Sequence, residues 1–377
     1  MCNKILPLGW KEKKLGEFFK VASGEFLSNK DMKENSYPVY GGNGITGWHS
    51  LYNTNEKRIV IGRVGAYCGC VYVTEDKAWI TDNALYIKEK KYDFNDKFMF
   101  YKLRYLNLNK YADKNAQPLI SGSKLYEIVA TMPEDKKEQE KIAQILSKVD
   151  ENIEKTTEAI AKYKQIKKGL MVDLLTGKIR IKNGKWVEET DFKYVEGIGN
   201  IPKEWELKSI GDTLKIKHGK NQKEVEDKNG LYPILGSGGN IGFSNKYLYS
   251  KESVLIGRKG TINKPQFINT PFWTIDTLFY SEIKKQYVAK FIYYKFINIK
   301  WTKYNEASGV PSLSASTIEK IKYSMPSEKA EQQMISNVLE KQDQLIEKEE
   351  QYLKKLQKLK SGLMDDLLTG RKRVNID

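Results

Sequence analysis

Two arginines stand in the sequence positions best suited to contact a charged ligand. Arg63 lies in the string Ile-Gly-Arg-Val-Gly, and Arg258 lies in Ile-Gly-Arg-Lys-Gly. A guanidinium that follows a short apolar run and precedes a flexible glycine can reach a phosphate or the edge of a guanine with two parallel hydrogen bonds. A structural salt bridge is the competing interpretation. Lys259 adds a second cation to the latter string.

Two glycine-rich segments, 41–48 and 236–243, offer short polar side chains on a tight backbone. Residues 42–47 satisfy the pattern G-x-G-x-x-G, but a dinucleotide-binding loop should open a helix, and the second copy loses the spacing. We therefore set nucleotide binding aside. Such turns can lay their side chains against base edges, and plain tight turns explain them equally well. The candidate contacts are Asn43, Thr46, Trp48, Ser237, Asn240 and Phe243.

Hydroxyl groups cluster in segments 117–124 and 310–316. Serine hydroxyls bind phosphate oxygens, and they also cap the helix or strand that follows. Both interpretations stay open for Ser121, Ser123, Lys124, Ser312 and Ser314.

The remaining reactive residue types are too few for a catalytic or metal site. The chain has two histidines, His49 and His218, and three cysteines, Cys2, Cys68 and Cys70, which we interpret as free thiols. Acidic residues 134 and 135 precede a predicted helix, where the helix dipole favours them. We expect no catalytic residue, no metal and no cofactor in this chain.

A tandem repeat positions all these segments. The nonapeptide Gly-Leu-Met-Val-Asp-Leu-Leu-Thr-Gly at 169–177 returns at 362–370 with one change, Val172 to Asp365. At an offset of about 193 to 195 residues the Ile-Gly-Arg strings align, Trp79 and Asp82 match Trp273 and Asp276, and the Met-Pro pairs at 132 and 325 coincide. A duplicated unit presents two similar surfaces, which suits a ligand with two similar halves.

Composition indicates a polyanionic ligand. The 64 Lys and Arg against 48 Asp and Glu leave a formal charge of +16, and the isoelectric point is near 9.3. A chain of 377 residues with 40% hydrophobic residues is large enough for two cores. The start of the sequence lacks the apolar run of a signal peptide, and no run of roughly 20 apolar residues suits a membrane span. We expect a soluble cytoplasmic protein.

Each repeat is predicted to combine a globular α+β domain with a long helix. Short strands at 57–61 and 67–73 alternate with Gly, Asn and Asp turns, and aromatic-rich stretches 96–108 and 287–299 predict helices. The stretches 136–175 and 329–368 lack proline, and each predicts a helix of about 36 residues, about 54 Å long at ~1.5 Å per residue. The expected division is 1–135 and 181–328 for the domains, and 136–180 and 329–377 for the helices with their tails.

Apolar residues at steps of three and four predict that the two long helices form an antiparallel coiled coil. The domains would then lie at opposite ends of a rod, and tails 176–181 and 369–374 would dock on the domain of the other half. Gly177 and Gly370 suit the position just after a helix end. The predicted interhelix core comprises Leu146, Val149, Ile153, Ile160, Leu339, Ile346, Leu353 and Leu356.

This layout resembles the specificity subunit of type I restriction-modification systems over essentially the whole chain. The supporting residues are the Trp10 and Trp205 domain starts, the Ile-Gly-Arg strings, the Met-Pro helix entries and the repeated nonapeptide. The resemblance implies a non-catalytic subunit whose two target-recognition domains read the halves of a bipartite, asymmetric site in double-stranded DNA. It also implies two methyltransferase (modification) subunits and restriction/translocase subunits as partners, which would carry S-adenosylmethionine, ATP and Mg. Outward helix residues such as Lys155, Glu158, Lys162, Lys348 and Lys355 are candidate partner contacts.

Two alternatives remain beside this interpretation. Some restriction systems fuse recognition, methylation and cleavage in one polypeptide, but the chain has no Pro-Pro pair, which the Asn/Asp-Pro-Pro-Tyr motif of adenine methyltransferases requires. A coiled-coil adaptor without its own sequence reading would explain the helices and leave the +16 charge without a role.

Overall fold

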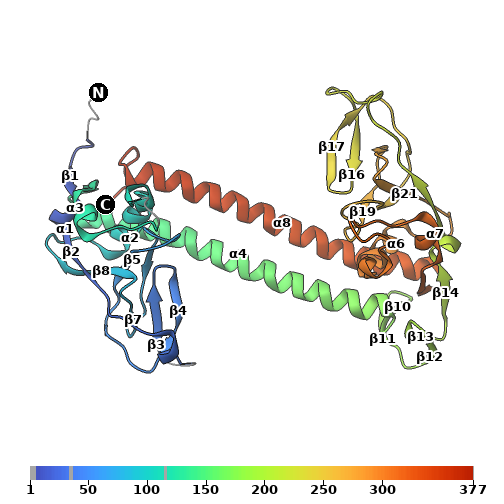
Figure 1. Cartoon of the computed structure of the whole chain (residues 1–377), viewed down its shortest axis with the longest axis horizontal. Helices are drawn as coiled ribbons and strands as arrows, with labels where there is room; N and C mark the ends of the chain where they lie inside the picture. Colours follow the sequence, from blue (N-terminus) through green and yellow to red (C-terminus); the bar gives the residue numbers. More distant parts are fainter. Residues whose placement is uncertain (1–5, 34–36, 114–116, 377) are drawn as a thin grey trace. The chain divides into compact units, whose positions relative to one another are not determined.

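The computed structural model describes residues 6–33, 37–113 and 117–376, which form two compact units. Unit 1 combines the chain up to residue 157 with the chain from residue 351 onward, and unit 2 comprises residues 158–350. Both long helices, α4 (Lys136–Thr176) and α8 (Lys329–Leu368), are continuous and contribute a part to each unit (Figure 1). The α+β class and the two long helices expected from the sequence are confirmed.

Unit 1 is built on an antiparallel four-stranded sheet, a mixed three-stranded sheet and a strand pair. Its four-stranded sheet has the order β2-β8-β5-β6, and its three-stranded sheet has the order β4-β3-β7, in which β7 runs parallel to β3. A separate pair, β1 with β9, connects the start of the domain to the entry of α4. The strands are β1 (Trp10–Lys14), β2 (Phe19–Ser23), β3 (Tyr37–Gly41), β4 (Gly44–His49), β5 (Ile59–Gly62), β6 (Val71–Val73), β7 (Trp79–Ile80), β8 (Ala84–Lys90) and β9 (Val129–Pro133).

Short helices complete unit 1: α1 (Leu15–Phe18), α2 (Asp96–Tyr105), α3 (Gly122–Glu127) and the 3₁₀ turns η1 (Asn29–Asp31) and η2 (Leu108–Tyr111). The helix expected at 96–108 ends earlier, because Asn107 adopts a left-handed conformation with φ of 48° and separates α2 from η2. The core joins Phe18, Phe98 and Ile142 to Leu367 and Leu368, so the end of α8 is part of the core of unit 1.

Unit 2 repeats this plan. The sheet orders are β15-β21-β18-β19 and β17-β16-β20, and β14 pairs with β22. The elements are β14 (Trp205–Ser209), α5 (Ile210–Thr213), β15 (Leu214–His218), β16 (Tyr232–Gly236), β17 (Gly239–Ser244), β18 (Ser253–Gly257), β19 (Gln266–Ile268), β20 (Trp273–Thr274), β21 (Leu278–Ile283), α6 (Ala289–Asn298), η3 (Trp301–Tyr304), α7 (Ala315–Lys320) and β22 (Lys322–Pro326). The core includes Leu174 and Leu175 from the end of α4.

Unit 2 also contains two hairpins that were not expected from the sequence. They fill the stretch between α4 and β14 and comprise β10 (Ile179–Lys182) with β11 (Lys185–Glu188), and β12 (Phe192–Val195) with β13 (Gly199–Pro202). The tail predicted after the first helix is therefore the first strand of a hairpin.

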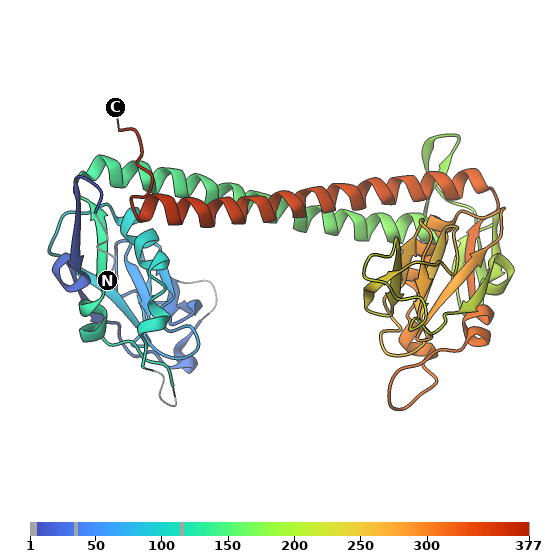
Figure 2. The same ribbon diagram turned by 90° about the horizontal axis from the view of Figure 1, so that it is seen from above.

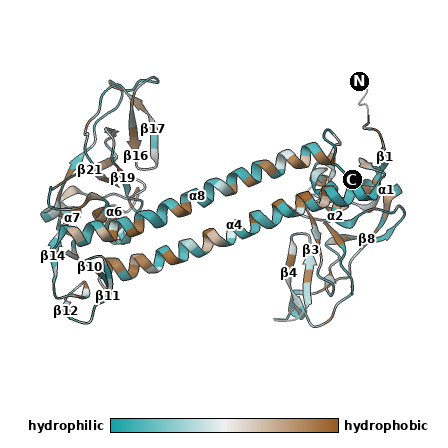
Figure 3. Ribbon diagram, turned by 180° about the vertical axis from the view of Figure 1, so that it is seen from behind, coloured by the Kyte–Doolittle hydropathy of each residue, from teal (hydrophilic) through white to brown (hydrophobic). Residues whose placement is uncertain are grey.

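The long helices run antiparallel within each unit, and polar and apolar residues mix along both (Figure 3). In unit 1, Lys360 Nζ of α8 lies 2.5 Å from Asp150 Oδ1 of α4. In unit 2, Lys164 pairs with Glu350 at 2.7 Å, and Gln342 donates to the carbonyl oxygen of Tyr163. Of the predicted interhelix residues, Leu146, Val149, Ile160, Leu339, Ile346 and Leu356 are buried, whereas Ile153 and Leu353 are partly exposed. Leu146 and Leu339 also pack into the domain cores.

Candidate functional site

Three loops of unit 1 that are far apart in the sequence meet around Arg63. The amide of Gly65 donates to the carbonyl of Pro118 at 2.9 Å, and the amide of Ile120 donates to the carbonyl of Arg63 at 2.9 Å. The β3–β4 turn closes the group, because a Cβ on Gly42 would lie 3.1 Å from the carbonyl oxygen of Val64. The glycine-rich turn, the arginine string and the hydroxyl segment are thus one cluster.

Unit 2 forms the same cluster through equivalent backbone bonds. The amide of Gly260 donates to Pro311, and the amide of Leu313 donates to Arg258, each at 2.9 Å. Lys259 forms an isolated bridge with Ser312. A Cβ on Gly260 would lie 3.6 Å from Ser237 Oγ, so the β16–β17 turn takes part as well. We call these groups the Arg63 cluster and the Arg258 cluster.

Both arginines are held by backbone carbonyl groups. Arg63 Nη1 donates to the carbonyl oxygen of Asp82 at 3.4 Å and to Ser23 Oγ at 3.2 Å, and Arg258 Nη1 donates to the carbonyl oxygen of Asp276 at 3.3 Å. Among the described residues neither forms an ion pair. A guanidinium held by neutral groups keeps its full charge for an external anion.

The other predicted contacts of the turns lie at the surface. Asn43 and Trp48 are exposed, and Thr46 Oγ1 donates to the carbonyl oxygen of Val39 at 3.3 Å. Asn240 is exposed and accepts a 2.9 Å hydrogen bond from the amide of Gly242. The pattern G-x-G-x-x-G at 42–47 forms the turn after β3 and the first four residues of β4, and it opens no helix.

The hydroxyl segments cap short helices. Ser121 Oγ accepts from the amide of Lys124 at the start of α3, and Ser314 Oγ accepts from the amide of Thr317 at the start of α7. Ser123 Oγ lies 2.9 Å from Ser121 Oγ, and the side chain of Lys124 is paired with Asp113. Both caps follow directly on the segments that contact Arg63 and Arg258. Ser121 and Ser314 therefore act as helix caps, which was one of the two interpretations that the sequence left open. Their hydroxyl groups also lie next to the Arg63 cluster and the Arg258 cluster.

A second recurring arrangement holds the end of each long helix on a domain. In unit 1, Lys102 Nζ donates to the carbonyl oxygen of Leu368 at 2.6 Å, and Tyr105 donates to Asp365 at 2.8 Å. In unit 2, Lys295 Nζ donates to the carbonyl oxygen of Leu175 at 2.9 Å. Figure 2 shows the C-terminal turns of α8 next to the domain of unit 1. The repeated nonapeptide is thus part of the docking segment, and each copy lies on the domain of the other repeat, to which the tails were expected to dock.

An arginine after each helix reinforces the docking. Arg180 in β10 forms two hydrogen bonds with the carboxylate of Glu331, at 2.8 and 2.6 Å, and Arg373 does the same with Glu138. Gly177 and Gly370 adopt φ of 74° and 73°, which confirms the predicted helix-end role. Burial lowers the pKa of Lys295 to about 7. The docking roles of Lys102 and Lys295, and of Arg180 and Arg373, were not predicted from the sequence. In each pair, the second residue lies 193 positions after the first, so the repeat could have indicated them.

The histidines, cysteines and acidic residues form no further candidate site in the described part of the chain. No group of three His, Cys, Asp or Glu there is placed to hold a metal ion, and no helix there is both long and apolar enough to cross a membrane. Cys68 and Cys70 are free thiols, as expected, and Cys2 lies outside the described residues. Glu134 pairs with Lys11, and Asp135 accepts from the amide of Lys137 at the helix start.

Comparisons with known proteins agree over most of the chain. A family model for the type I restriction modification DNA specificity domain matches residues 7–165 and 202–358. The EcoprrI specificity subunit of Escherichia coli is 36% identical over 145 residues, which span 37% of this chain and 36% of that protein. The MjaVIII specificity subunit of Methanocaldococcus jannaschii is 25% identical over 98% of this chain and 94% of that protein.

Solved structures show the same fold. The S subunit of a type I restriction-modification system from M. genitalium matches with a TM-score of 0.74 and 19% identity over 98% of both chains. A chain from a study of complex assembly and conformational transition of the type I R-M system matches with a TM-score of 0.51 and 12% identity over 97% of this chain and 98% of that chain.

Proposed function

Because this chain belongs to the type I restriction-modification DNA specificity family, we propose that it selects the DNA sequence on which such a complex acts. Each unit reads one half of a bipartite, asymmetric target in double-stranded DNA, and the chain itself performs no chemistry. The observation that carries the proposal is the pair of equivalent clusters, in which an arginine is kept and its neighbours differ.

The constant and variable parts of the clusters suit two separate tasks. Arg63 and Arg258 have the same backbone support, so they would make the same contact in both units, to a phosphate or to a guanine edge. Val64 in one cluster stands where Lys259 stands in the other, and the turns present Asn43 or Ser237. Different side chains on one frame would select different bases, which gives an asymmetric site. The formal charge of +16 supports affinity for the phosphate backbone.

The long helices supply the spacing and the partner surface in this proposal. A helix of 41 residues is about 60 Å long at ~1.5 Å per residue, which exceeds one ~34 Å turn of duplex DNA. The halves of the target would therefore be separated by unread base pairs. Exposed charged residues, and exposed apolar residues that include Ile166 and Leu359, offer contacts for two modification subunits. Ile166 and Leu359 are equivalent in the repeat, which suits two equivalent partners.

The same proposal assigns the chemistry to partners. Methylation would use S-adenosylmethionine on the modification subunits, and restriction/translocase subunits would use ATP and Mg. The domain division proposed is 1–135 and 181–328 for reading, and 136–180 and 329–377 for helices with docking tails.

The test is to express the chain with a modification subunit and map methylated adenines in DNA. We expect a gapped, asymmetric motif that changes in only one half when residues 41–48 are exchanged for those of a relative, and in the other half when residues 236–243 are exchanged. Exchange of the exposed β11 residues 185–188 is the matched control and should leave the motif unchanged. A motif that neither loop exchange alters would refute reading by these loops. No methylation and no retention of duplex DNA would favour the coiled-coil adaptor.

A further inference from the structure

One position on the edge strand of the four-stranded sheet is occupied by different residue types in the two units. In unit 1, Tyr72 of β6 pairs with Val60 of β5. In unit 2, Gln266 of β19 pairs with Leu255 of β18. Val60 and Leu255 each stand two residues before the glycine of an Ile-Gly-Arg string. Tyr72 and Gln266 therefore take the same place on the repeated domain, although their side chains differ in chemistry.

Tyr72 supports the β3–β4 turn of unit 1. A Cβ on Gly44 would lie 3.0 Å from Tyr72 Cε1, so the ring lies directly against the backbone that leaves the turn. The Tyr72 hydroxyl lies 3.5 Å from Asn43 Oδ1, at the long limit of a hydrogen bond. A Cβ on Gly62 of β5 would clash with the carbonyl oxygen of Gly42 in the same turn. Strands β5 and β6 therefore hold this turn together.

Gln266 supports the β16–β17 turn of unit 2 from the other side. Its Nε2 donates a 2.9 Å hydrogen bond to the carbonyl oxygen of Gly236, the last residue of β16 before the turn. A Cβ on Gly239, the equivalent of Gly44, would meet no atom of the described residues within 4 Å beyond its chain neighbours. The equivalent position thus reaches the equivalent turn in both units, but it holds a different side of that turn.

This support decides which groups of each turn remain open to a ligand. In unit 1 the ring of Tyr72 covers the backbone at Gly44, and the side chain of Asn43 is exposed. In unit 2, Gln266 takes up one carbonyl group, and the backbone at Gly239 stays uncovered. Base edges differ in their pattern of donors and acceptors, so two turns that are held from different sides suit different bases. A turn that is already held in place also loses less entropy on binding.

We propose that Tyr72 and Gln266 are positioning residues for base recognition, and that each fixes the turn of its own unit and thereby the base preference of one half of the target. This inference rests on the proposed function, because it requires that the turns read DNA. It adds a determinant outside the glycine-rich segments, on a strand of the other sheet. Exchange of a turn alone would then transfer only part of the specificity, and exchange of the supporting residue with it would transfer more.

The test measures base discrimination by the chain assembled with a modification subunit. For duplexes that differ from the target by one base pair, kcat/KM for methylation is divided by the value for the target, separately for each half. Tyr72→Gln brings the unit 2 residue into β6 and removes the ring from Gly44. We expect it to reduce discrimination at least about fivefold in one half and to leave the other half unchanged. Gln266→Met removes the amide donor and should have the same effect on the other half.

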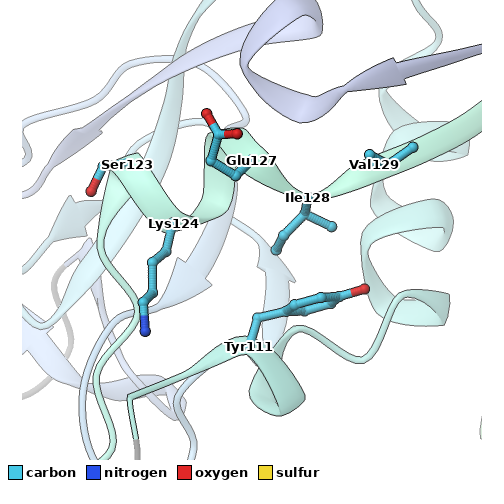
Figure 4. A pocket seen from close by; sticks show the side chains of 6 residues that line it. All are labelled: Tyr111, Ser123, Lys124, Glu127, Ile128 and Val129. Atoms are coloured by element: carbon cyan, nitrogen blue, oxygen red, sulfur yellow. The ribbon is translucent and has the colours of Figure 1, made fainter.

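Two further variants separate positioning from other roles. Tyr72→Phe keeps the ring against Gly44 and loses only the hydroxyl, so its discrimination should stay close to that of the wild-type chain. Tyr111→Gln is the matched control, because Tyr111 belongs to the same unit and lines a surface hollow with Lys124 and Ile128 (Figure 4). It should leave both halves unchanged. A merely destabilised chain would methylate every duplex more slowly by a similar factor, and the ratios would stay the same.

Several outcomes would overturn the inference. Wild-type ratios in Tyr72→Gln and Gln266→Met, a loss of discrimination in both halves from one substitution, or an equal loss in Tyr111→Gln would each exclude a positioning role. An equal loss in Tyr72→Phe and Tyr72→Gln would exclude positioning by the ring, because the hydroxyl itself would then be the reading group. The absence of any sequence preference in the wild-type complex would instead refute the proposed function, so the two failures are distinguishable.

Discussion

Lys295 Nζ donates a 2.9 Å hydrogen bond to the carbonyl oxygen of Leu175, so a buried lysine caps the end of the first long helix. The last carbonyl groups of a helix have no partner within the helix, and the amine of Lys295 supplies a donor to one of them. The bond connects residues that lie 120 positions apart. It anchors the repeated nonapeptide on the domain of unit 2.

Replacing this lysine should change both stability and its pH dependence. Burial lowers the pKa of Lys295 from its ordinary 10.5 to about 7. Between these values the unfolded chain binds more protons than the folded chain, so the contribution of Lys295 to stability rises with pH from about 7 to about 10.5. Lys295→Met should therefore destabilise the protein more at pH 9.5 than at pH 6.5, by about 1–3 kcal/mol at the higher pH from the lost bond.

Urea unfolding at several pH values measures this effect. Lys162→Met, at an exposed position of α4, is the control and should follow the wild-type pH profile. Parallel profiles for wild type and Lys295→Met would show that Lys295 does not change its protonation in this range.

The glycine after the first long helix should tolerate no side chain. Gly177 has φ of 74°, and a Cβ there would lie 2.4 Å from Pro202 Cγ. Gly177→Ala combines left-handed backbone strain with this clash and should cost about 1–3 kcal/mol. Gly169→Ala in the same nonapeptide is the matched control: the site is helical and open, so alanine should stabilise by about 0.5–1 kcal/mol. Thermal unfolding distinguishes the two, and equal melting temperatures would contradict this account.

The two docking arginines should differ in importance. Both side chains of the Arg180 and Glu331 pair are 5% exposed, whereas the side chain of Arg373 is 43% exposed and reaches Glu138 from the surface. Arg180→Met leaves the buried carboxylate of Glu331 without its partner, removes the pairs of Arg180 with Glu189 and Glu204, and should cost about 3–5 kcal/mol. Arg373→Met leaves only the buried carboxylate of Glu138 without its arginine and should cost less. The double variant Arg180→Met with Glu331→Met should recover part of the loss. A larger loss in the double variant than in Arg180→Met would refute the buried-charge explanation.

The long helices and their docking tails could be predicted from the sequence. Runs 136–175 and 329–368 lack proline, keep an apolar seam and end at a glycine, and the structure begins and ends these helices within one residue of the expected positions. The repeat also indicated which loop of one half corresponds to which loop of the other. These signals are local or internal to the chain, so no tertiary information was needed.

The docking lysines and the two hairpins of unit 2 could not be predicted from the sequence. Lys102 and Lys295 lie on amphipathic helices, where a lysine is ordinarily exposed, and only the tertiary fold buries them against a helix end. Strand β11 is exposed at every position and β12 has no buried residue, so neither shows the apolar alternation that predicts a strand. The capping role of Ser121 and Ser314 likewise required the helix starts to be known.

The arginine clusters lead to the last prediction, on DNA binding by the assembled complex. Arg63→Ala and Arg258→Ala should each weaken binding by about 1–3 kcal/mol if the guanidinium contacts a base, with relaxed specificity in one half of the target only. If the contact is to a phosphate, binding should weaken for all sequences, and the slope of log K against log salt should become less steep by about 1. Lys185→Ala removes a charge from the exposed strand β11 and is the control for the loss of net charge. Because both arginines have the same backbone support, the two variants should fall in the same class. Affinity and salt slope equal to those of Lys185→Ala would remove the arginines from the interface and would leave the turns as the remaining candidates for base reading.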